Sequence, residues 1–234
     1  MGQMFGRNTG FLGRRDLLRL IGAGGVGMAA GFFNPSVASG ATSVMDADAA
    51  LQRLMGGNQR FMAQQLESPH QSLQRVQEVA YSQQPFAVIL SCADSRVPAE
   101  IVFDEGIGDI FDIRIAGNIV TPEVLGSLEY AIAILGTRLI MVLGHERCGA
   151  VTAAVADEAV PGSIDTLVKA IQPAIALTEG SKDVVLDAAV VANVRYQMDA
   201  IRRNSPLIAE RLLKQQVKLV GGRYDLDSGE VTLV

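Results

Sequence analysis

The sequence predicts an α/β fold whose central sheet is mostly parallel. Continuous apolar runs are typical of strands that are buried on both faces. Five such runs lie at 85–91, 110–115, 139–144, 217–222 and 231–234. Segments of helical length lie between them, at 121–135, 151–156, 163–178 and 183–203. Because strands that alternate with helices form parallel sheets with helices on both faces, we expect four parallel strands.

The first part of the domain is predicted to add two helices, and the last part an antiparallel strand. Apolar residues recur at helical spacing over 46–66, and a polar helix is expected at 72–82. These two helices form a predicted N-terminal helical arm over 46–82. Residues 225–229, Asp-Leu-Asp-Ser-Gly, are typical of a tight turn between strands. The last run is therefore predicted to pair in the antiparallel direction, as the C-terminal edge strand of the sheet.

The composition excludes several classes of protein. Twenty Lys and Arg against 25 Asp and Glu give the 234 residues a net charge of −5, whereas a nucleic-acid-binding protein presents a basic surface. A hydrophobic fraction of 49% excludes a disordered chain. Two Cys and two His exclude a disulfide framework and are enough for one Cys/His metal site. The length fits one domain with an appendage.

Residues 1–41 differ in composition from the rest of the chain. Arg14 and Arg15 precede an apolar, glycine-rich stretch over 17–33, and small residues follow at 35–41. This order is typical of an export signal peptide, and the paired arginines resemble the twin-arginine type. We therefore expect export to the periplasm or another extracytoplasmic compartment, with 42–234 as the functional domain. The alternative is an uncleaved N-terminal anchor helix, and only export or such an anchor would involve the membrane.

Three of the four Cys and His side chains follow two of the predicted strands directly. Cys92 comes after the first strand, and His145 and Cys148 come after the third. Ligands of open parallel sheets bind beyond the carboxyl ends of the strands, so these residues meet if the two strands are neighbours. Two thiolates and one imidazole suit zinc and leave a fourth position open, as in catalytic zinc sites. The alternative is two ordinary buried thiols and a core histidine.

Asp94 and Arg96 lie just beyond Cys92 and allow two interpretations. The simpler one is a surface ion pair, which contributes about 0–1 kcal/mol. The functional one begins from the two thiolates, which neutralise the charge of Zn²⁺ and weaken it as a Lewis acid. A carboxylate would then orient the water that attacks the substrate, and an arginine fork would hold that carboxylate away from the metal.

At these residues the sequence resembles the β-class carbonic anhydrases, over Leu51–Val234. The specific motifs are Cys92-x-Asp94-x-Arg96 and His145-x-x-Cys148-Gly149. Supporting matches are Gly57-Asn58-x-Arg60-Phe61, Gln83-Gln84-Pro85, Phe111-x-x-Arg114, Ala116-Gly117-Asn118 and Tyr224-Asp225-Leu226. The resemblance implies one zinc ion per chain, held by Cys92, His145 and Cys148. It also implies reversible hydration of CO₂ to bicarbonate and a proton by zinc-bound hydroxide, with Asp94 and Arg96 as the catalytic dyad.

The resemblance also implies a substrate pocket and an assembly. Gln83 would orient the substrate, with Gln84 as the immediate alternative, and Gly149 would adjoin the substrate. Phe111 matches an apolar pocket position that the family can supply across a dimer interface. The implied assembly is a homodimer or a tetramer of dimers, without nucleic acid. In it the arm at 46–82 wraps the partner subunit, the alternative being that the arm packs on its own sheet.

The absence of Trp bears on the state of the metal site, and two rival functions stand beside CO₂ hydration. One branch of the family is inactive when the aspartate coordinates zinc, and bicarbonate favours that state from a site that uses a Trp. This chain has no Trp. We therefore expect the open state, with water on zinc. The rival functions are hydrolysis of carbonyl sulfide or carbon disulfide on the same scaffold, and a catalytically idle, zinc-containing structural or bicarbonate-sensing subunit.

Overall fold

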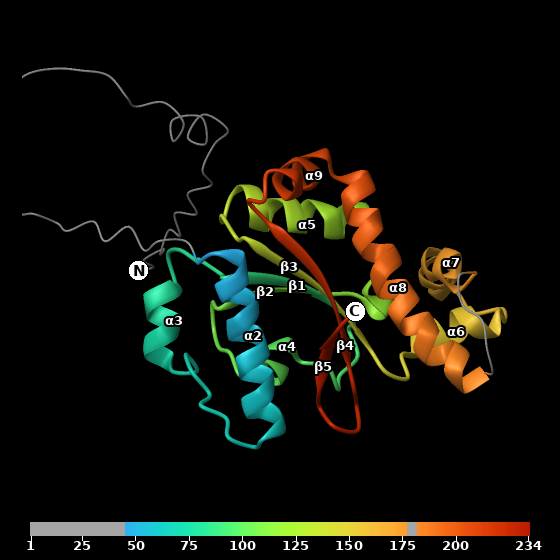
Figure 1. Ribbon diagram of the computed structural model, residues 1–234, viewed down its shortest axis with the longest axis horizontal. Helices are drawn as coiled ribbons and strands as arrows, with labels where there is room; N and C mark the ends of the chain where they lie inside the picture. The colour runs from blue at the N-terminus through green and yellow to red at the C-terminus, as the bar shows by residue number, and fades with distance from the viewer. Residues whose placement is uncertain (1–44, 177–181) are drawn as a thin grey trace, which may run out of the picture. The chain divides into compact units, whose positions relative to one another are not determined.

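The computed structural model describes residues 45–176 and 182–234. These residues form a five-stranded sheet in the order β2-β1-β3-β4-β5 (Figure 1). The strands are β1 (Ala87–Ser91), β2 (Ile110–Arg114), β3 (Leu139–His145), β4 (Lys218–Tyr224) and β5 (Val231–Leu233). The first four are parallel to one another, and β5 pairs with β4 in the antiparallel direction. The predicted fold class is therefore confirmed.

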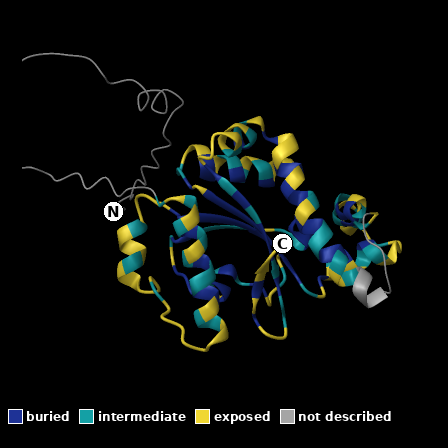
Figure 2. Cartoon of the chain, viewed as in Figure 1, coloured by how far each residue is buried: buried dark blue, intermediate teal, exposed yellow. Residues whose placement is uncertain are grey.

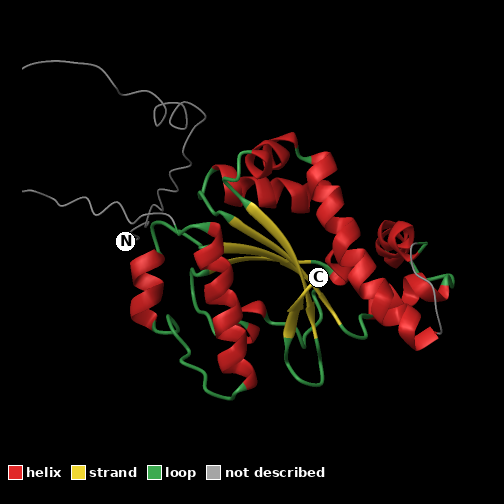
Figure 3. Cartoon of the chain, in the orientation of Figure 1, coloured by secondary structure: helices red, strands yellow, loops and turns green. Residues whose placement is uncertain are grey.

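Helices surround this sheet (Figure 3). Within the described ranges they are α2 (Ala47–Met62), α3 (Leu73–Val79), α4 (Ala99–Val102), α5 (Pro122–Ala133), α6 (Gly149–Ala156), α7 (Ile164–Ile175), α8 (Lys182–Asn204) and α9 (Pro206–Leu213), with a 3₁₀ turn η1 (Ala116–Asn118). Side-chain caps begin several of them, as the sequence suggests. Asp46 accepts hydrogen bonds from the N–H groups of Asp48 and Ala49, and Thr121 caps α5 ahead of Pro122.

The two faces of the sheet bury different residues of the same strands. Ala87 and Ile89 of β1 face α2 and α4, whereas Val88 and Leu90 face α5, α8 and α9. All four side chains are fully buried, and Figure 2 shows the strands as the dark blue centre of the domain. Because both faces are covered, β1 has no polar alternation, which explains its continuous apolar sequence.

The helical arm divides into two parts with different packing. Ala50 and Leu54 of α2 are fully buried against the chain's own sheet. In contrast, α3 has no buried residue in the described chain, and Leu73 is 82% exposed. Arg75 of α3 donates from Nε to the carbonyl of Ile107 at 2.9 Å. The chain's own sheet therefore accounts for α2, and the contact of the arm with a partner subunit stays a prediction.

The predicted export signal at 1–41 lies outside the described residues, which begin at residue 45. It therefore remains a prediction. Among the described helices, none is long and apolar enough to cross a membrane.

Candidate metal centre and active site

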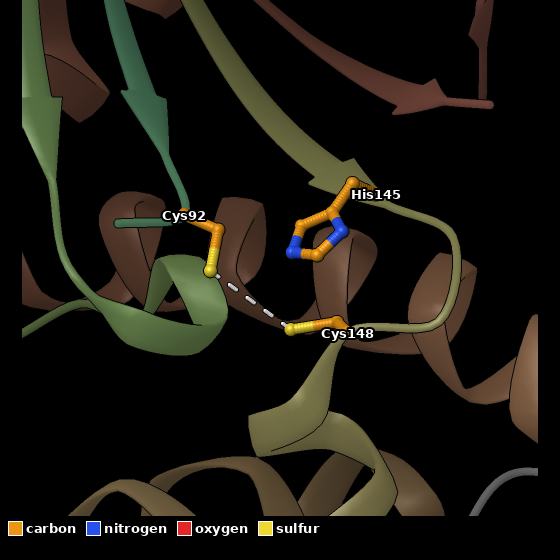
Figure 4. Close-up of side chains that lie close together, drawn as sticks. All are labelled: Cys92, His145 and Cys148. Atoms are coloured by element: carbon orange, nitrogen blue, oxygen red, sulfur yellow. Dashed lines mark hydrogen bonds between the residues drawn. The ribbon is translucent and has the colours of Figure 1, made fainter. Parts of the chain in front are cut away.

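The carboxyl ends of β1 and β3 bring the three predicted metal ligands together. The strands are parallel neighbours, with Ser91 opposite Leu143. Cys92 follows β1, His145 ends β3, and Cys148 caps the start of α6. All three side chains are buried, and their ligand atoms lie within 4.8 Å of one another. Figure 4 shows the side chains pointing toward one another.

The imidazole of His145 is oriented for metal binding by the backbone of the next residue, Glu146. Its Nδ1 lies 2.9 Å from the carbonyl oxygen of Glu146 and donates to it. This leaves Nε2 as the nitrogen with a lone pair. Nε2 is buried and has no hydrogen-bond partner among the described residues. Since buried polar atoms are nearly always partnered, this nitrogen indicates a missing ligand rather than a core histidine.

The geometry of the two sulfur atoms fits zinc. The Sγ atoms of Cys92 and Cys148 are 4.0 Å apart. Two sulfurs that are each bound at about 2.3 Å to one tetrahedral ion lie about 3.8 Å apart. The donor set of two sulfurs and one nitrogen is also one that zinc prefers, and it leaves a fourth position open for water or substrate. The residues present can therefore hold zinc.

Hydrogen bonds to the two sulfur atoms change the pKa of each thiol. The hydrogen bond between the two thiols lowers the pKa of Cys92 and raises that of Cys148. The amide of Gly117 also donates to Cys92 Sγ at 3.4 Å. Backbone N–H groups of Ala150 and Val151, in the first turn of α6, face Cys148 and favour its thiolate. Both sulfur atoms thus face backbone donors, which stabilise thiolate charge.

The Asp94–Arg96 pair stands beside the cluster as a bidentate ion pair. Arg96 donates from Nε to Oδ1 at 2.9 Å and from Nη2 to Oδ2 at 2.7 Å, and its backbone N–H donates to Oδ1. These hydrogen bonds from Arg96 hold the pKa of Asp94 well below its usual range. Asp94 Oδ2 lies 3.8 Å from His145 Nε2. The carboxylate therefore faces the ligands while its own oxygens are held by arginine.

Arg114 holds the backbone of this loop, a role that sequence reasoning leaves unassigned. Its Nε and Nη2 both donate to the carbonyl of Cys92 at 3.1 Å, and Nη2 also donates to the carbonyl of Asp94. Arg114 ends β2 and is paired with Ser91, the residue before Cys92. The rule that strand ends share one edge of the sheet could have identified it.

The predicted substrate residues fall into two groups. Gly149 follows Cys148 and begins α6, so it adjoins the cluster. Phe111 is paired with Val88, three residues before the end of β2, which is about 10 Å along the strand. Gln83 precedes β1, at the opposite end of that strand from Cys92. The structure therefore brings the ligands and the dyad together in one chain, but it does not bring Gln83 or Phe111 to them.

Gln83 and Phe111 lie near a shared aromatic residue instead. Gln83 lines a surface hollow of about 550 Å³ together with Tyr81, Gly108 and Tyr130. The ring of Phe111 lies 6.3 Å from that of Tyr130, centroid to centroid. The two residues predicted to contact substrate thus lie near Tyr130, away from the metal cluster of the same chain.

Several known proteins are similar to this chain in sequence and in fold. The carbonic anhydrase family model matches residues 87–231. Carbonic anhydrase 2 of Mycobacterium tuberculosis (strain H37Rv) is 40% identical over 191 residues, which cover 79% of this chain and 91% of that protein. Carbonic anhydrase of Mycolicibacterium smegmatis is 38% identical over 189 residues, covering 79% and 92%.

The solved structures agree with these relatives. A crystal structure from a study of two tetrameric β-carbonic anhydrases of Sordaria macrospora superposes with a TM-score of 0.61 at 26% identity. The match covers 68% of this chain and 84% of that one. The family match, the identity over most of the domain and the shared fold show that this chain belongs to the β-carbonic anhydrase family of enzymes.

Proposed function

We propose that the protein catalyses the reversible hydration of CO₂ to bicarbonate with one zinc ion per chain. The observation that carries this proposal is the Asp94 carboxylate, which Arg96 holds against a buried cluster of Cys92, His145 and Cys148. A structural zinc site needs a closed set of four ligands and no such carboxylate. Three ligands beside an oriented carboxylate favour a catalytic site over the alternative of a catalytically idle subunit.

The chain's own residues would position the reacting groups. Bound zinc would supply a Lewis acid that activates water for attack on CO₂. Asp94, kept ionised by Arg96, would accept a hydrogen bond at Oδ2 from the attacking water and orient it. The hydrogen bonds from Arg96 to both carboxylate oxygens would hold Asp94 away from the fourth position of the metal. This arrangement supports the open state that the absence of Trp suggests.

A stopped-flow assay tests this function. We expect the purified protein to hydrate CO₂, followed by proton release to an indicator, with a rate proportional to a zinc content of about one per chain. Sulfide release from carbonyl sulfide, measured on the same sample, addresses the hydrolase alternative. Zinc-loaded protein that is inert toward CO₂ would contradict the proposal, with sulfide release then favouring the hydrolase and complete inertness favouring the idle subunit.

We also propose that the active enzyme is a homodimer in which each chain completes its partner's pocket. Gln83 and Phe111 lie away from their own cluster, and the hollow beside Gln83 is bordered by exposed apolar side chains. These are Tyr81, Ile107 and Tyr130, with exposed fractions of 100%, 42% and 47%. A second copy that covers this surface would bury apolar area and place Gln83 and Phe111 over the partner's metal.

Hybrid dimers test whether Gln83 serves the metal site of its own chain or that of the partner. Chains carrying Gln83→Ala and Cys148→Ala would be co-expressed with different tags, and the hybrid isolated by two affinity steps. If Gln83 serves the partner, the hybrid has one complete site of two and about half of the wild-type activity. If Gln83 serves its own chain, the hybrid has no complete site and is as inactive as the two parent homodimers, which would refute the shared pocket.

A further inference from the structure

A chain of buried hydrogen bonds connects α8 with a sulfur atom of the metal cluster. The N–H of Gly117 donates to Cys92 Sγ at 3.4 Å, and the carbonyl of the same residue accepts from Asn193 Nδ2 at 2.9 Å. Asn193 is 1% exposed and belongs to α8. One glycine thus joins a ligand of the proposed zinc site to a buried amide that lies 76 residues further along the chain.

The turn that holds Gly117 has an unusual backbone. Gly117 has φ +73° and Asn118 has φ +44°, so two successive residues adopt the left-handed region. Glycine adopts this region readily, whereas an asparagine there needs support from its surroundings. A Cβ on Gly117 would lie 2.6 Å from Cδ1 of Ile171, so no other residue fits there without a shift. The direction of the Gly117 N–H therefore depends on the contacts that hold this turn.

Gln197 sets the orientation of Asn193. It lies one turn later on α8, is 2% exposed, and donates from Nε2 to Asn193 Oδ1 at 3.0 Å. Gln197 is itself fixed, because its Oε1 accepts from the N–H of Val120 at 2.9 Å. Since Asn193 Oδ1 faces Gln197, its Nδ2 is the group that faces Gly117. The network leaves the Asn193 amide with one orientation.

We propose that Asn193, oriented by Gln197, is a positioning residue that holds the Gly117 N–H against the Cys92 thiolate and so strengthens zinc binding. The inference rests on the proposed function, because it takes the cluster to be a zinc site. An N–H donor stabilises negative charge on the sulfur and fixes the sulfur's direction. Partners that hold metal ligands in this way commonly change metal affinity when they are lost.

Asn58 provides a matched control. It is also 1% exposed, and it donates from Nδ2 to the carbonyls of Val102 and Gly229 at 3.1 and 2.9 Å. Its Oδ1 accepts from the N–H of Val231 at 2.9 Å. Val102 and Val231 belong to the apolar cluster that packs with α2, whereas Cys92 belongs to another cluster. Asn58→Asp therefore removes buried donor bonds of the same kind without touching Gly117.

The test compares zinc affinity in Asn193→Asp, Asn58→Asp and the wild type, by competition with a chromophoric chelator. In Asn193→Asp a carboxylate oxygen replaces the donor that faces the Gly117 carbonyl. We expect its zinc dissociation constant to rise about tenfold. With Co²⁺ in place of zinc, we also expect its thiolate-to-cobalt absorption band to shift. Asn58→Asp should lower stability but keep the wild-type affinity and spectrum.

The outcomes separate this inference from the proposed function. Equal zinc affinities and cobalt spectra in all three proteins would overturn the positioning role alone. A wild-type protein that binds no zinc would overturn the proposed function, and this inference with it. If Asn193→Asp does not fold, Gln197→Glu serves the same test, since it removes the donor that orients Asn193, and we expect a smaller loss of affinity in the same direction.

Discussion

Replacing Cys148 with Ala is expected to remove zinc and abolish CO₂ hydration. The substitution deletes one of three ligands from a cluster whose sulfur atoms lie 4.0 Å apart. Loss of the Lewis acid removes several kcal/mol of transition-state stabilisation, so activity should fall at least about 1,000-fold. Metal analysis of the purified variant and stopped-flow CO₂ hydration would measure the two effects. A variant that retains stoichiometric zinc or wild-type turnover would contradict the ligand assignment.

Val151→Ala is the matched control for Cys148→Ala. Val151 is 1% exposed, lies on α6 next to the cluster, and packs in the same apolar group as Cys148. Its truncation removes buried hydrocarbon without removing a donor atom, and should lower the free energy of unfolding by about 1–3 kcal/mol. We expect this variant to keep its zinc. The comparison separates loss of a ligand from loss of packing in the same part of the core.

The middle of the sheet can be predicted from the sequence because helices cover both of its faces. Such strands lose polar alternation, so β1 and β3 are recognisable as apolar runs without any knowledge of their partners. The metal cluster follows from the same observation. Once β1 and β3 are parallel neighbours, Cys92 and His145 must share one edge of the sheet. The prediction of the site thus depends on topology more than on the ligands themselves.

Shorter elements are less predictable. The sequence pattern does not predict α4 or η1, which have 4 and 3 residues and too few turns to show a helical period. It also does not predict α9, although Ser205 and Pro206 provide both a cap and a first-turn proline. Only Ser205 separates the 23-residue α8 from the 8-residue α9, so the start of a second helix is not apparent.

Tertiary polar contacts are the part of the site that sequence spacing cannot supply. Arg114 reaches a carbonyl 22 residues away, and Asn193 reaches one 76 residues away. Neither separation in sequence corresponds to the period of a helix or a strand, so spacing alone does not predict these contacts. Gln83 is close to Cys92 in the sequence but not in space. The extended strand β1 lies between them and places them at its opposite ends.

Replacing Asp94 with Asn is expected to leave zinc in place and to slow CO₂ hydration about 100-fold. The side chain keeps its shape but loses the charge that Arg96 holds through two hydrogen bonds. The pKa of Asp94 is lowered by Arg96, so the carboxylate is ionised throughout the neutral range. The ratio of wild-type to variant turnover should therefore stay constant between about pH 6 and 9, which lies well above the ordinary pKa of Asp. Stopped-flow rates and metal analysis at several pH values would measure both properties.

Asp227→Asn is the matched control for Asp94→Asn. Asp227 also accepts two hydrogen bonds from one arginine, Arg147, at 2.6 and 3.1 Å, but it is exposed and pairs outside the Cys–His–Cys cluster. Its neutralisation should change neither zinc content nor turnover. Equal rates in wild type and Asp94→Asn would refute the catalytic role, and loss of zinc would show that Asp94 supports the metal. Slow turnover with full zinc, in Asp94→Asn alone, would show that this carboxylate acts on the reacting water.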